Sequence, residues 1–382
     1  MNPSGDTEAA RFRDEVREFG KSWASRADPF QVFKDRSGVS AEIYRSLGER
    51  DWLSIGWGGY GRYGERAPLF EFILWDELAY QRLVRPSLAA GIVAKSLIAA
   101  GSEQQKSEYL PRIGSGEFSF ALGYSEPEAG SDLAGLQCRA ISAGDRYVIR
   151  GEKRWTSDAH HSDALWLLAR TGPADSGTRG LSLFIVDLRA SGVVISPIPT
   201  LDGHQLNTVH LDDVEVEADR LVGQPGEAWP IVQRALAEER HLQVLPGRLR
   251  RDFEDLVAWS IESETLVQPE LHSQLAQIAA DIDMVEAGCW QLVTDAMLRR
   301  DSLLLAARQK LIGTELMQRI ARLPSERGDP GCVVEGSPFW MLWRQCILET
   351  IAGGTTQVMR DMIARKVLGL GAGRNNPTVA GR

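Results

Sequence analysis

The sequence predicts an N-terminal α-helical domain, a middle antiparallel β-domain and a C-terminal four-helix bundle. Apolar residues recur at helical spacing over about the first 120 of the 382 residues. Short runs rich in β-branched and aromatic residues, broken by Gly, Asp and Pro, fill the stretch from Phe118 to Val222. Helical patterns return from Trp229 onward. We therefore expect domains over residues 1–118, 119–224 and 225–382.

The N-terminal domain is predicted to consist of helices separated by turns. Charged residues lie between apolar ones at the spacing that gives a helix one buried face. The predicted helices are Thr7–Ala27, Ala41–Leu47, Leu69–Leu83, Gly91–Gly101 and Glu103–Gly114.

A glycine-rich segment in this domain has the spacing of a dinucleotide-binding fingerprint. Gly59, Gly61 and Gly64 spell G-x-G-x-x-G after an apolar stretch and before a helix. A true fingerprint lies in a βαβ unit of a parallel sheet, and no strand pattern follows the next helix here. We therefore interpret the segment as a turn between helices rather than as a Rossmann site.

The middle segment has the pattern of an antiparallel sheet. Runs such as RYVIRGEKRW, DALWLLART and LSLFIVDL favour strands, and turn residues separate them. A parallel sheet would need long helices between its strands, and none is predicted.

The C-terminal helices have lengths suited to a four-helix bundle. Gly353 and Gly354 interrupt the last of them. The predicted helices are Trp229–Ser260, Pro269–Arg300, Leu303–Arg322 and Pro338–Val367.

Composition and charge argue against several classes of function. The net charge of −9 disfavours a nucleic-acid-binding surface. No apolar run approaches the roughly 18 residues of a membrane span, and the polar N-terminus lacks the apolar core of a secretion signal. The four cysteines are widely spaced, and the adjacent His160 and His161 fit turn residues better than metal ligands. We expect a cytoplasmic protein without a metal site.

The segment LGYSEPEAGSD, Leu122–Asp132, carries the clearest functional signal. Backbone N–H groups and small hydroxyls at a bend can hydrogen-bond the polar edge of a flavin, and a glycine allows close approach. The segment resembles the flavin loop of the acyl-CoA dehydrogenase family. A surface β-turn of similar composition is the alternative. The resemblance implies FAD as the cofactor, contacted by Leu122, Tyr124, Ser125, Gly130 and Ser131, with Ser131 also touching the substrate.

A second segment, GEKRWTSD at Gly151–Asp158, is similar to the family's other flavin element. In the family an aromatic residue lies against the flavin and a following hydroxyl hydrogen-bonds it. Trp155 and Ser157 match these positions. The alternative is a tryptophan buried in the β-domain core.

The family desaturates the bond between the α and β carbons of an acyl-CoA thioester. The reaction requires a carboxylate to remove the α-proton, a flavin N5 to accept the β-hydride, and a hydrogen bond to the thioester oxygen. Many members carry the carboxylate in a late Glu-Gly-Thr segment, where this chain has Gly353, Gly354 and Thr355. The resemblance implies that the Gly353 amide bonds the thioester oxygen and that Gly354 contacts substrate. It also implies that Thr355 and Gln357 contact FAD. A simple helix break at the two glycines is the alternative.

A minority of the family places the base on the first helix of the C-terminal domain. There a Glu-Arg pair approaches the same α-carbon, and Glu239-Arg240 aligns with it. Desolvation by substrate and flavin would raise the pKa of such a carboxylate towards a useful value. The resemblance therefore implies Glu239 as the base, with Arg240 anchoring the CoA portion or the helix. A solvated face of charged residues, with Glu238 included, is the alternative.

Two cofactor-binding elements of the family are missing. The stretch Ser260–Gln268 lacks the Arg-x-x-Phe-Gly segment, and the stretch Gly328–Phe339 lacks Phe-Gly-Gly. Both elements hold FAD across a subunit interface in the family. The chain resembles the base-bearing subunit of bacterial α2β2 acyl-CoA dehydrogenases that act on bulky thioesters such as sterol side chains. We expect a second dehydrogenase subunit or a homo-oligomer, and an electron-transfer flavoprotein as acceptor.

Three other functions stay open from the sequence. A flavin monooxygenase of the same fold would not need the carboxylate base. A related desaturase would act on an acyl group tethered to a carrier protein. A non-catalytic partner subunit would complete another chain's cofactor site, although the missing segments are those that such a partner should supply.

Overall fold

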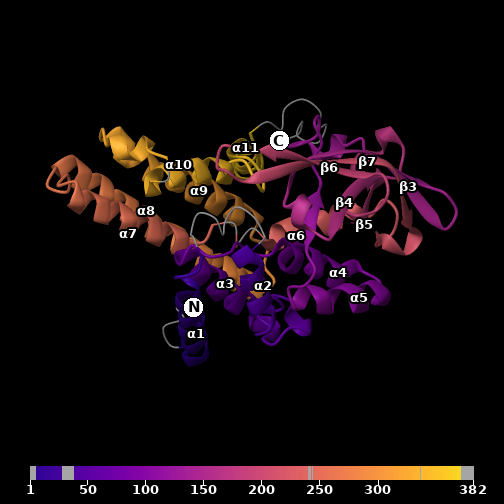
Figure 1. The fold of residues 1–382 in the computed structure, drawn as a ribbon, viewed down its shortest axis with the longest axis horizontal. Helices are drawn as coiled ribbons and strands as arrows, with labels where there is room; N and C mark the ends of the chain where they lie inside the picture. Colours follow the sequence, from indigo (N-terminus) through magenta and orange to yellow (C-terminus); the bar gives the residue numbers. More distant parts are fainter. Residues whose placement is uncertain (1–5, 28–37, 240–241, 243, 336, 371–382) are drawn as a thin grey trace, which may run out of the picture. The chain divides into compact units, whose positions relative to one another are not determined.

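The computed structural model describes residues 6–27, 38–239, 242, 244–335 and 337–370. Described residues up to 239 form one compact unit, and those from 242 onward form a second (Figure 1). Helices open the first unit, a β-sheet follows, and the second unit is helical, as the sequence predicted. None of the described helices is both long and apolar enough to cross a membrane.

The predicted N-terminal helices are confirmed, α5 at its predicted bounds and the others with shifted bounds. Residues Ala89–Ala94 form a π-helical turn, η4, that leads into α4, so the helix predicted over Gly91–Gly101 has two parts. The glycine-rich segment lies in two short 3-10 turns, η2 (Gly58–Tyr60) and η3 (Gly64–Arg66), as a turn between helices should. The helices are α1 (Thr7–Trp23), α2 (Gly38–Gly48), α3 (Ala67–Tyr80), α4 (Lys95–Ala100) and α5 (Glu103–Gly114).

The β-domain is one eight-stranded sheet among the described residues. Along its main path the strand order is β6-β7-β3-β2-β4-β5-β8, and β1 pairs with β4 off this path. The strands are β1 (Phe120–Gly123), β2 (Arg139–Ser142), β3 (Arg146–Ser157), β4 (Ala164–Arg170), β5 (Leu181–Asp187), β6 (Val193–Pro199), β7 (Gln205–Glu217) and β8 (Leu221–Val222).

The sheet is antiparallel in most pairs but not in all. Strand β1 runs parallel to β4 over four residue pairs, and β2 meets β4 in parallel at Arg139 and Arg170. A parallel pair needs a long connection, and the β2–β3 hairpin with its flanking loops supplies it between β1 and β4 without an α-helix. Every residue of β4 is buried, and its side chains Leu165 and Leu167 pack in the core with Phe184 of β5.

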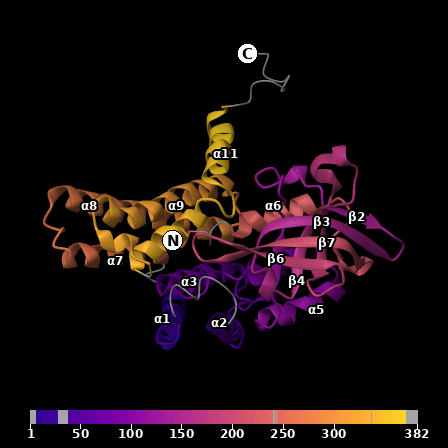
Figure 2. The same cartoon turned by 45° about the horizontal axis from the view of Figure 1, so that its top comes forward.

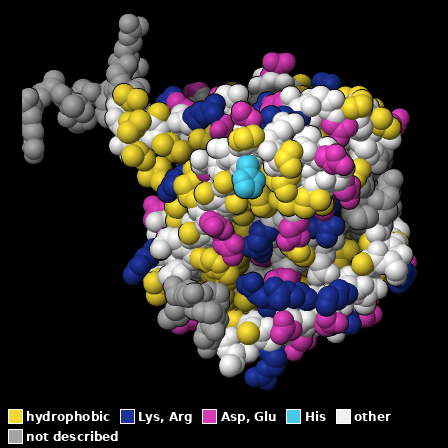
Figure 3. Space-filling model, turned by 90° about the vertical axis from the view of Figure 1, so that its left-hand side faces the viewer, with side chains coloured by type: hydrophobic (Ala, Val, Ile, Leu, Met, Phe, Trp, Pro, Cys, Tyr) yellow, Lys and Arg dark blue, Asp and Glu magenta, His cyan; other side chains and the backbone are white. Residues whose placement is uncertain are grey.

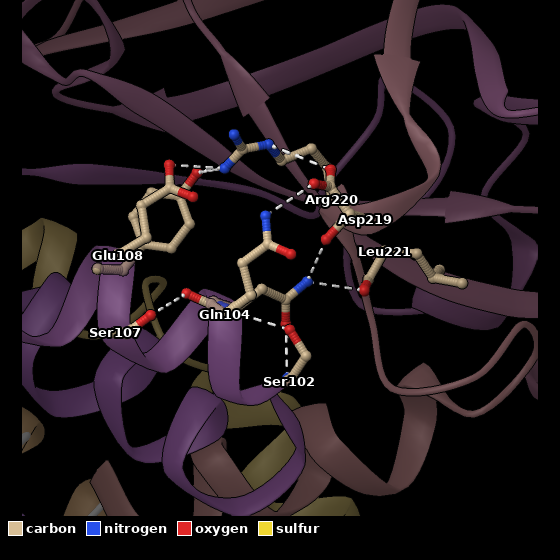
Figure 4. A network of polar contacts seen from close by, with 9 residues as sticks. Ser102, Gln104, Ser107, Glu108, Asp219, Arg220 and Leu221 are labelled. Atoms are coloured by element: carbon tan, nitrogen blue, oxygen red, sulfur yellow. Dashed lines mark hydrogen bonds and ion pairs between the residues drawn. The ribbon is translucent and has the colours of Figure 1, made fainter.

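Helix α5 is joined to the β-domain by a polar network (Figure 4). The buried Gln105 side chain donates to the carbonyls of Asp219 (2.7 Å) and Leu221 (2.9 Å). Its amide oxygen accepts from the N–H of Ser102, whose hydroxyl caps the helix in return. One side chain therefore both starts α5 and ties it to the end of the sheet.

We expect Gln105→Ala to lower the free energy of unfolding by about 2–3 kcal/mol, because it removes half of a capping box and leaves two carbonyls unpaired. The side chain of the neighbouring Gln104 is exposed and donates to the Asp219 carboxylate at 3.2 Å. Gln104→Ala should therefore cost less than about 0.5 kcal/mol. Urea unfolding of both variants measures the difference, and equal losses would contradict this role for Gln105.

The helix predicted over Trp229–Ser260 is wrong as a single element. Helix α6 (Ala228–Glu239) contacts α4 and β5 in the first unit, whereas α7 belongs to the second unit and begins at Pro246. Proline lacks an N–H and disfavours a helical residue before it, and Leu245 is extended, with φ −103° and ψ 112°.

The second unit is built around α9. Helices α7, α8, α10 and α11 all contact α9, and Figure 2 shows α11 projecting from the other four. The predicted break at the glycine pair is confirmed, because it separates α10 from α11. The helices are α7 (Pro246–Glu262), α8 (Pro269–Met297), α9 (Leu303–Glu326), α10 (Pro338–Glu349) and α11 (Thr356–Leu368).

Candidate active site

The predicted flavin loop leaves the sheet at the end of β1. Leu122 is paired with Trp166 of β4, and Tyr124 and Ser125 follow directly. Glu126 and Ala129 then exchange two backbone hydrogen bonds, of 3.0 and 3.1 Å, which close a tight turn. The Ser125 carbonyl accepts from the N–H of Arg154 at 2.9 Å. The loop is therefore tied to β3 just before the second predicted flavin element.

A buried ion pair anchors this loop. Lys153 of β3 is fully buried, and its Nζ lies 2.7 Å from Glu126 Oε1 and 3.1 Å from the Tyr124 carbonyl oxygen. The Glu126 carboxylate also accepts the N–H groups of Gln137 (2.7 Å) and Cys138 (2.9 Å). Buried charges are stable only when they are paired and hydrogen-bonded, so these contacts fix both ends of the loop.

The Glu126–Lys153 pair and the neighbouring Cys138 have a structural role, not a reactive one. Burial raises the pKa of the Cys138 thiol to about 11, so the thiol stays protonated at neutral pH.

Sequence reasoning missed the roles of Glu126 and Lys153. Glu126 lies within the segment Leu122–Asp132, and a lysine in the middle of a strand pattern indicates that a buried partner is needed.

Gly130 and Ser131 lie at the exposed tip of the loop. A Cβ placed on Gly130 would have no protein atom within 4 Å, so the space beside this glycine is open. Neighbouring protein atoms would therefore leave room for a side chain at this position. Because glycine has none, a ligand can approach the backbone there.

Trp155 lies in a bulge of β3, where the pairing with β7 shifts between Lys153 and Thr156. Its backbone has φ +57°, a left-handed conformation that is uncommon for a bulky residue. The side chain is 46% exposed, so the alternative of a buried core tryptophan is wrong. Strained residues persist where surrounding structure holds them, often at ligand sites.

Ser157 is the last residue of β3 and pairs with Leu206. The segment around it is held by the fully buried Asn207, whose amide lies 3.1 Å from the Thr156 carbonyl and 3.0 Å from His160 Nδ1. His160 and His161 lie in the short turn η6 (Ala159–His161), as predicted. The described residues hold no cluster of His, Cys, Asp or Glu suited to a metal ion.

The second unit carries the predicted glycine turn. Gly353 and Gly354 have φ +65° and +104°, which only glycine adopts without strain. A Cβ on Gly354 would also lie 2.6 Å from the Met359 side chain. Thr355 caps α11, because its hydroxyl accepts from the Val358 N–H at 3.2 Å, and Gln357 is exposed on the first turn.

The remaining predicted residues lie where α6 ends. Glu239 is the last residue of that helix, and Arg240 lies outside the described residues. In the first unit, the structure thus places the loop residue Ser125 against Arg154 of β3, the residue before Trp155, and Tyr124 adjoins Ser125. Gly353 and the residues after it belong to the second unit.

Family comparisons agree with this architecture. The N-terminal, middle and C-terminal domains of acyl-CoA dehydrogenases match residues 6–117, 121–214 and 226–368. The chain is 33% identical to acyl-CoA dehydrogenase FadE26 of Mycobacterium tuberculosis, over 87% of this chain and 88% of that protein. It is 32% identical to FadE29 of the same organism, over 94% and 95%. The chain therefore belongs to the acyl-CoA dehydrogenase family, a family of flavoprotein oxidoreductases.

Two solved structures are also similar. The Tcur3481-Tcur3483 steroid ACAD superimposes with a TM-score of 0.89 at 31% identity, covering 97% of this chain and 99% of that one. The ChsE4-ChsE5 complex from M. tuberculosis gives a TM-score of 0.86 at 29% identity, with the same coverage.

Proposed function

We propose that the protein catalyses FAD-dependent α,β-dehydrogenation of a bulky acyl-CoA thioester. The observation that carries the proposal is the half-exposed, strained Trp155, held beside Ser157 and a loop anchored by Glu126 and Lys153. This arrangement suits a flat aromatic ring that needs a stacking surface and hydrogen-bond donors at its edge. FAD, when bound, supplies the acceptor for the β-hydride.

Tyr124, Ser125 and Ser157 would hold the polar edge of the flavin in this proposal, together with the backbone of Leu122 and Gly130. Ser131 would contact both flavin and substrate from the open tip of the loop. Thr355 and Gln357, at the start of α11, would contact FAD.

Glu239 is the proposed base that removes the α-proton. Gly353 occupies the position where many relatives carry that carboxylate, and a glycine has no group that can take a proton. The Gly353 N–H would instead donate to the thioester oxygen, where negative charge develops as the proton leaves. Arg240 would anchor the CoA portion and Gly354 would contact the acyl group.

The substrate and partner follow from the relatives. One similar structure is named as a steroid ACAD and another as a two-protein complex, and we propose the same class of substrate and an α2β2 assembly here. The second unit exposes large apolar side chains, among them Val267 at 85% and Val333 at 71%, that a partner subunit would cover. Figure 3 shows one face on which exposed hydrophobic side chains gather between charged ones. An electron-transfer flavoprotein is the proposed electron acceptor.

The assembly is tested by expressing the chain alone and with a neighbouring dehydrogenase subunit. We expect the chain alone to be colourless, and the pair to form a yellow tetramer with about half a flavin per subunit, because two cofactor-binding segments are missing here. Visible spectra and native mass give both quantities. A yellow tetramer of the single chain, with one flavin per subunit, would contradict the split site.

The reaction is tested by mixing the flavin-loaded protein anaerobically with octanoyl-CoA, palmitoyl-CoA and cholyl-CoA. The proposal predicts rapid loss of the oxidised flavin absorbance, fastest with the bulky thioester and without NADPH. Reduction by NADPH but by none of the thioesters would favour the monooxygenase. Reduction only by a carrier-protein thioester would favour the tethered substrate.

A further inference from the structure

A buried lysine of α9 contacts the glycine turn. Lys310 is 2% exposed, and its Nζ donates to the carbonyl oxygens of Glu349 (2.8 Å) and Ala352 (2.5 Å). Removing an ammonium group from water is costly unless strong hydrogen bonds replace its hydration. A smaller, neutral donor could also hydrogen-bond these two carbonyl oxygens. The buried charge of Lys310 therefore points to a role beyond holding them.

The Ala352 carbonyl belongs to the same peptide group as the Gly353 N–H. A peptide group is planar, and none of the described peptide bonds is cis, so the C=O and the N–H point in opposite directions. By holding the Ala352 carbonyl, Lys310 therefore also sets the direction of the Gly353 N–H. Ala352 and Gly353 are exposed, while Lys310 lies buried behind them.

The Gly353 N–H is available for a ligand. Within the described residues, no backbone or side-chain oxygen accepts a hydrogen bond from it. Its left-handed φ of +65° directs the chain into a sharp turn immediately before α11. A donor that is fixed in direction and has no acceptor in the protein is preorganised for an incoming oxygen.

The ammonium group also changes the strength of this donor. A cation bonded to a peptide carbonyl draws electron density towards the oxygen and makes the N–H more positive. Hydrogen bonds in such chains strengthen one another by about 10–30%. The effect is largest where charge develops on the acceptor, as on a thioester oxygen during removal of the α-proton.

The turn has other anchors that do not touch this peptide group. Gln318 of α9 donates to the Thr350 hydroxyl at 3.2 Å, and the Thr356 N–H donates to the Thr350 carbonyl at 3.1 Å. Loss of the Gln318 contact would loosen the turn without changing the polarity of the Gly353 amide. Gln318 therefore offers a matched control.

We propose that Lys310 is a positioning residue for the thioester oxygen, acting through the Ala352–Gly353 peptide group that it orients and polarises. The inference rests on the proposed function, which assigns the Gly353 N–H to that oxygen. Lys310 itself would touch neither substrate nor flavin.

The test uses infrared difference spectra of the flavin-loaded protein with a bound enoyl-CoA, labelled with 13C at its thioester carbonyl. The probe is the product of whichever of octanoyl-CoA, palmitoyl-CoA or cholyl-CoA reduces the wild-type flavin fastest. Wild-type protein should shift the labelled carbonyl stretch to lower wavenumber, and Lys310→Met should lose most of that shift. We expect kcat to fall about ten-fold with less change in KM, below the roughly 10²–10³-fold cost of losing an oxyanion donor entirely.

Gln318→Leu should keep the shift, and Lys310→Arg should restore most of it. If Lys310→Met does not fold, Lys310→Gln takes its place, because it also removes the charge. A folded, flavin-containing variant without the charge that keeps the full shift would overturn the inference, as would equal loss of the shift in Gln318→Leu. If no thioester reduces the wild-type flavin, the proposed function fails first, and the inference fails with it.

Discussion

Glu239→Gln should lower the rate of flavin reduction by acyl-CoA by roughly two to four orders of magnitude, the usual contribution of a positioned general base. The amide has nearly the shape of the carboxylate but cannot take a proton from the α-carbon. Flavin content and the urea midpoint should stay close to wild type. Anaerobic stopped-flow absorbance measures the rate, and the visible spectrum measures flavin content.

Glu238→Gln is the matched control, because it removes the same charge from the adjacent position of α6. It should reduce the flavin at nearly the wild-type rate. Unchanged reduction by Glu239→Gln would remove Glu239 from the role of base. Equal loss in both variants would indicate that the net charge at the end of α6 matters, and not a specific proton acceptor.

Lys153→Met should lower the free energy of unfolding by about 3–5 kcal/mol, because it leaves the buried Glu126 carboxylate without its counter-ion. Among the described residues, only the backbone N–H groups of Gln137 and Cys138 would then still donate to this carboxylate. Since the same lysine holds the Tyr124 carbonyl, the flavin loop should loosen and FAD should be lost on gel filtration. Urea unfolding and the flavin absorbance measure the two effects.

A more solvent-accessible ion pair, formed by another residue of β3, provides the control for Lys153. Arg146 of β3 lies 2.6 Å from Glu215 of β7, and the two side chains are 39% and 61% exposed, so Arg146→Met should cost less than about 1 kcal/mol. The double variant Lys153→Met/Glu126→Leu should be more stable than Lys153→Met alone, because no buried charge is left unpaired. A Lys153→Met protein as stable as Arg146→Met, with its flavin retained, would contradict the anchoring role.

The fold could be predicted from the sequence because each domain has its own hydrophobic period. The alternation of apolar and charged residues predicted α5 at its observed bounds, Glu103–Gly114. Errors occurred where one residue overrides a pattern. Pro246 starts the new helix α7 and disfavours a helical Leu245 before it, although the apolar repeat continues on both sides. The π-helical turn Ala89–Ala94 has the apolar composition of an ordinary helix, so its sequence does not reveal it.

The candidate site could be predicted only where residue type and short spacing carry the signal. Trp155 and Ser157 were found from a local segment, but the strained backbone that exposes Trp155 depends on pairing with β7. The Glu126–Lys153 pair joins residues far apart in the sequence, as does the contact of Lys310 with Ala352. Long-range contacts of this kind have no local period, so the sequence pattern does not predict them.

The most direct test of the central claim is the identity of the product after one anaerobic turnover. The flavin-loaded protein would be mixed with one equivalent per flavin of an acyl-CoA deuterated at its α-carbon, and the thioester would be analysed by mass spectrometry and NMR. We predict one enoyl-CoA formed for each flavin reduced, with one hydrogen lost from each of the α and β carbons and the α-deuterium released to water. Flavin reduction without an enoyl-CoA, or a thioester recovered unchanged, would contradict α,β-dehydrogenation as the function of this protein.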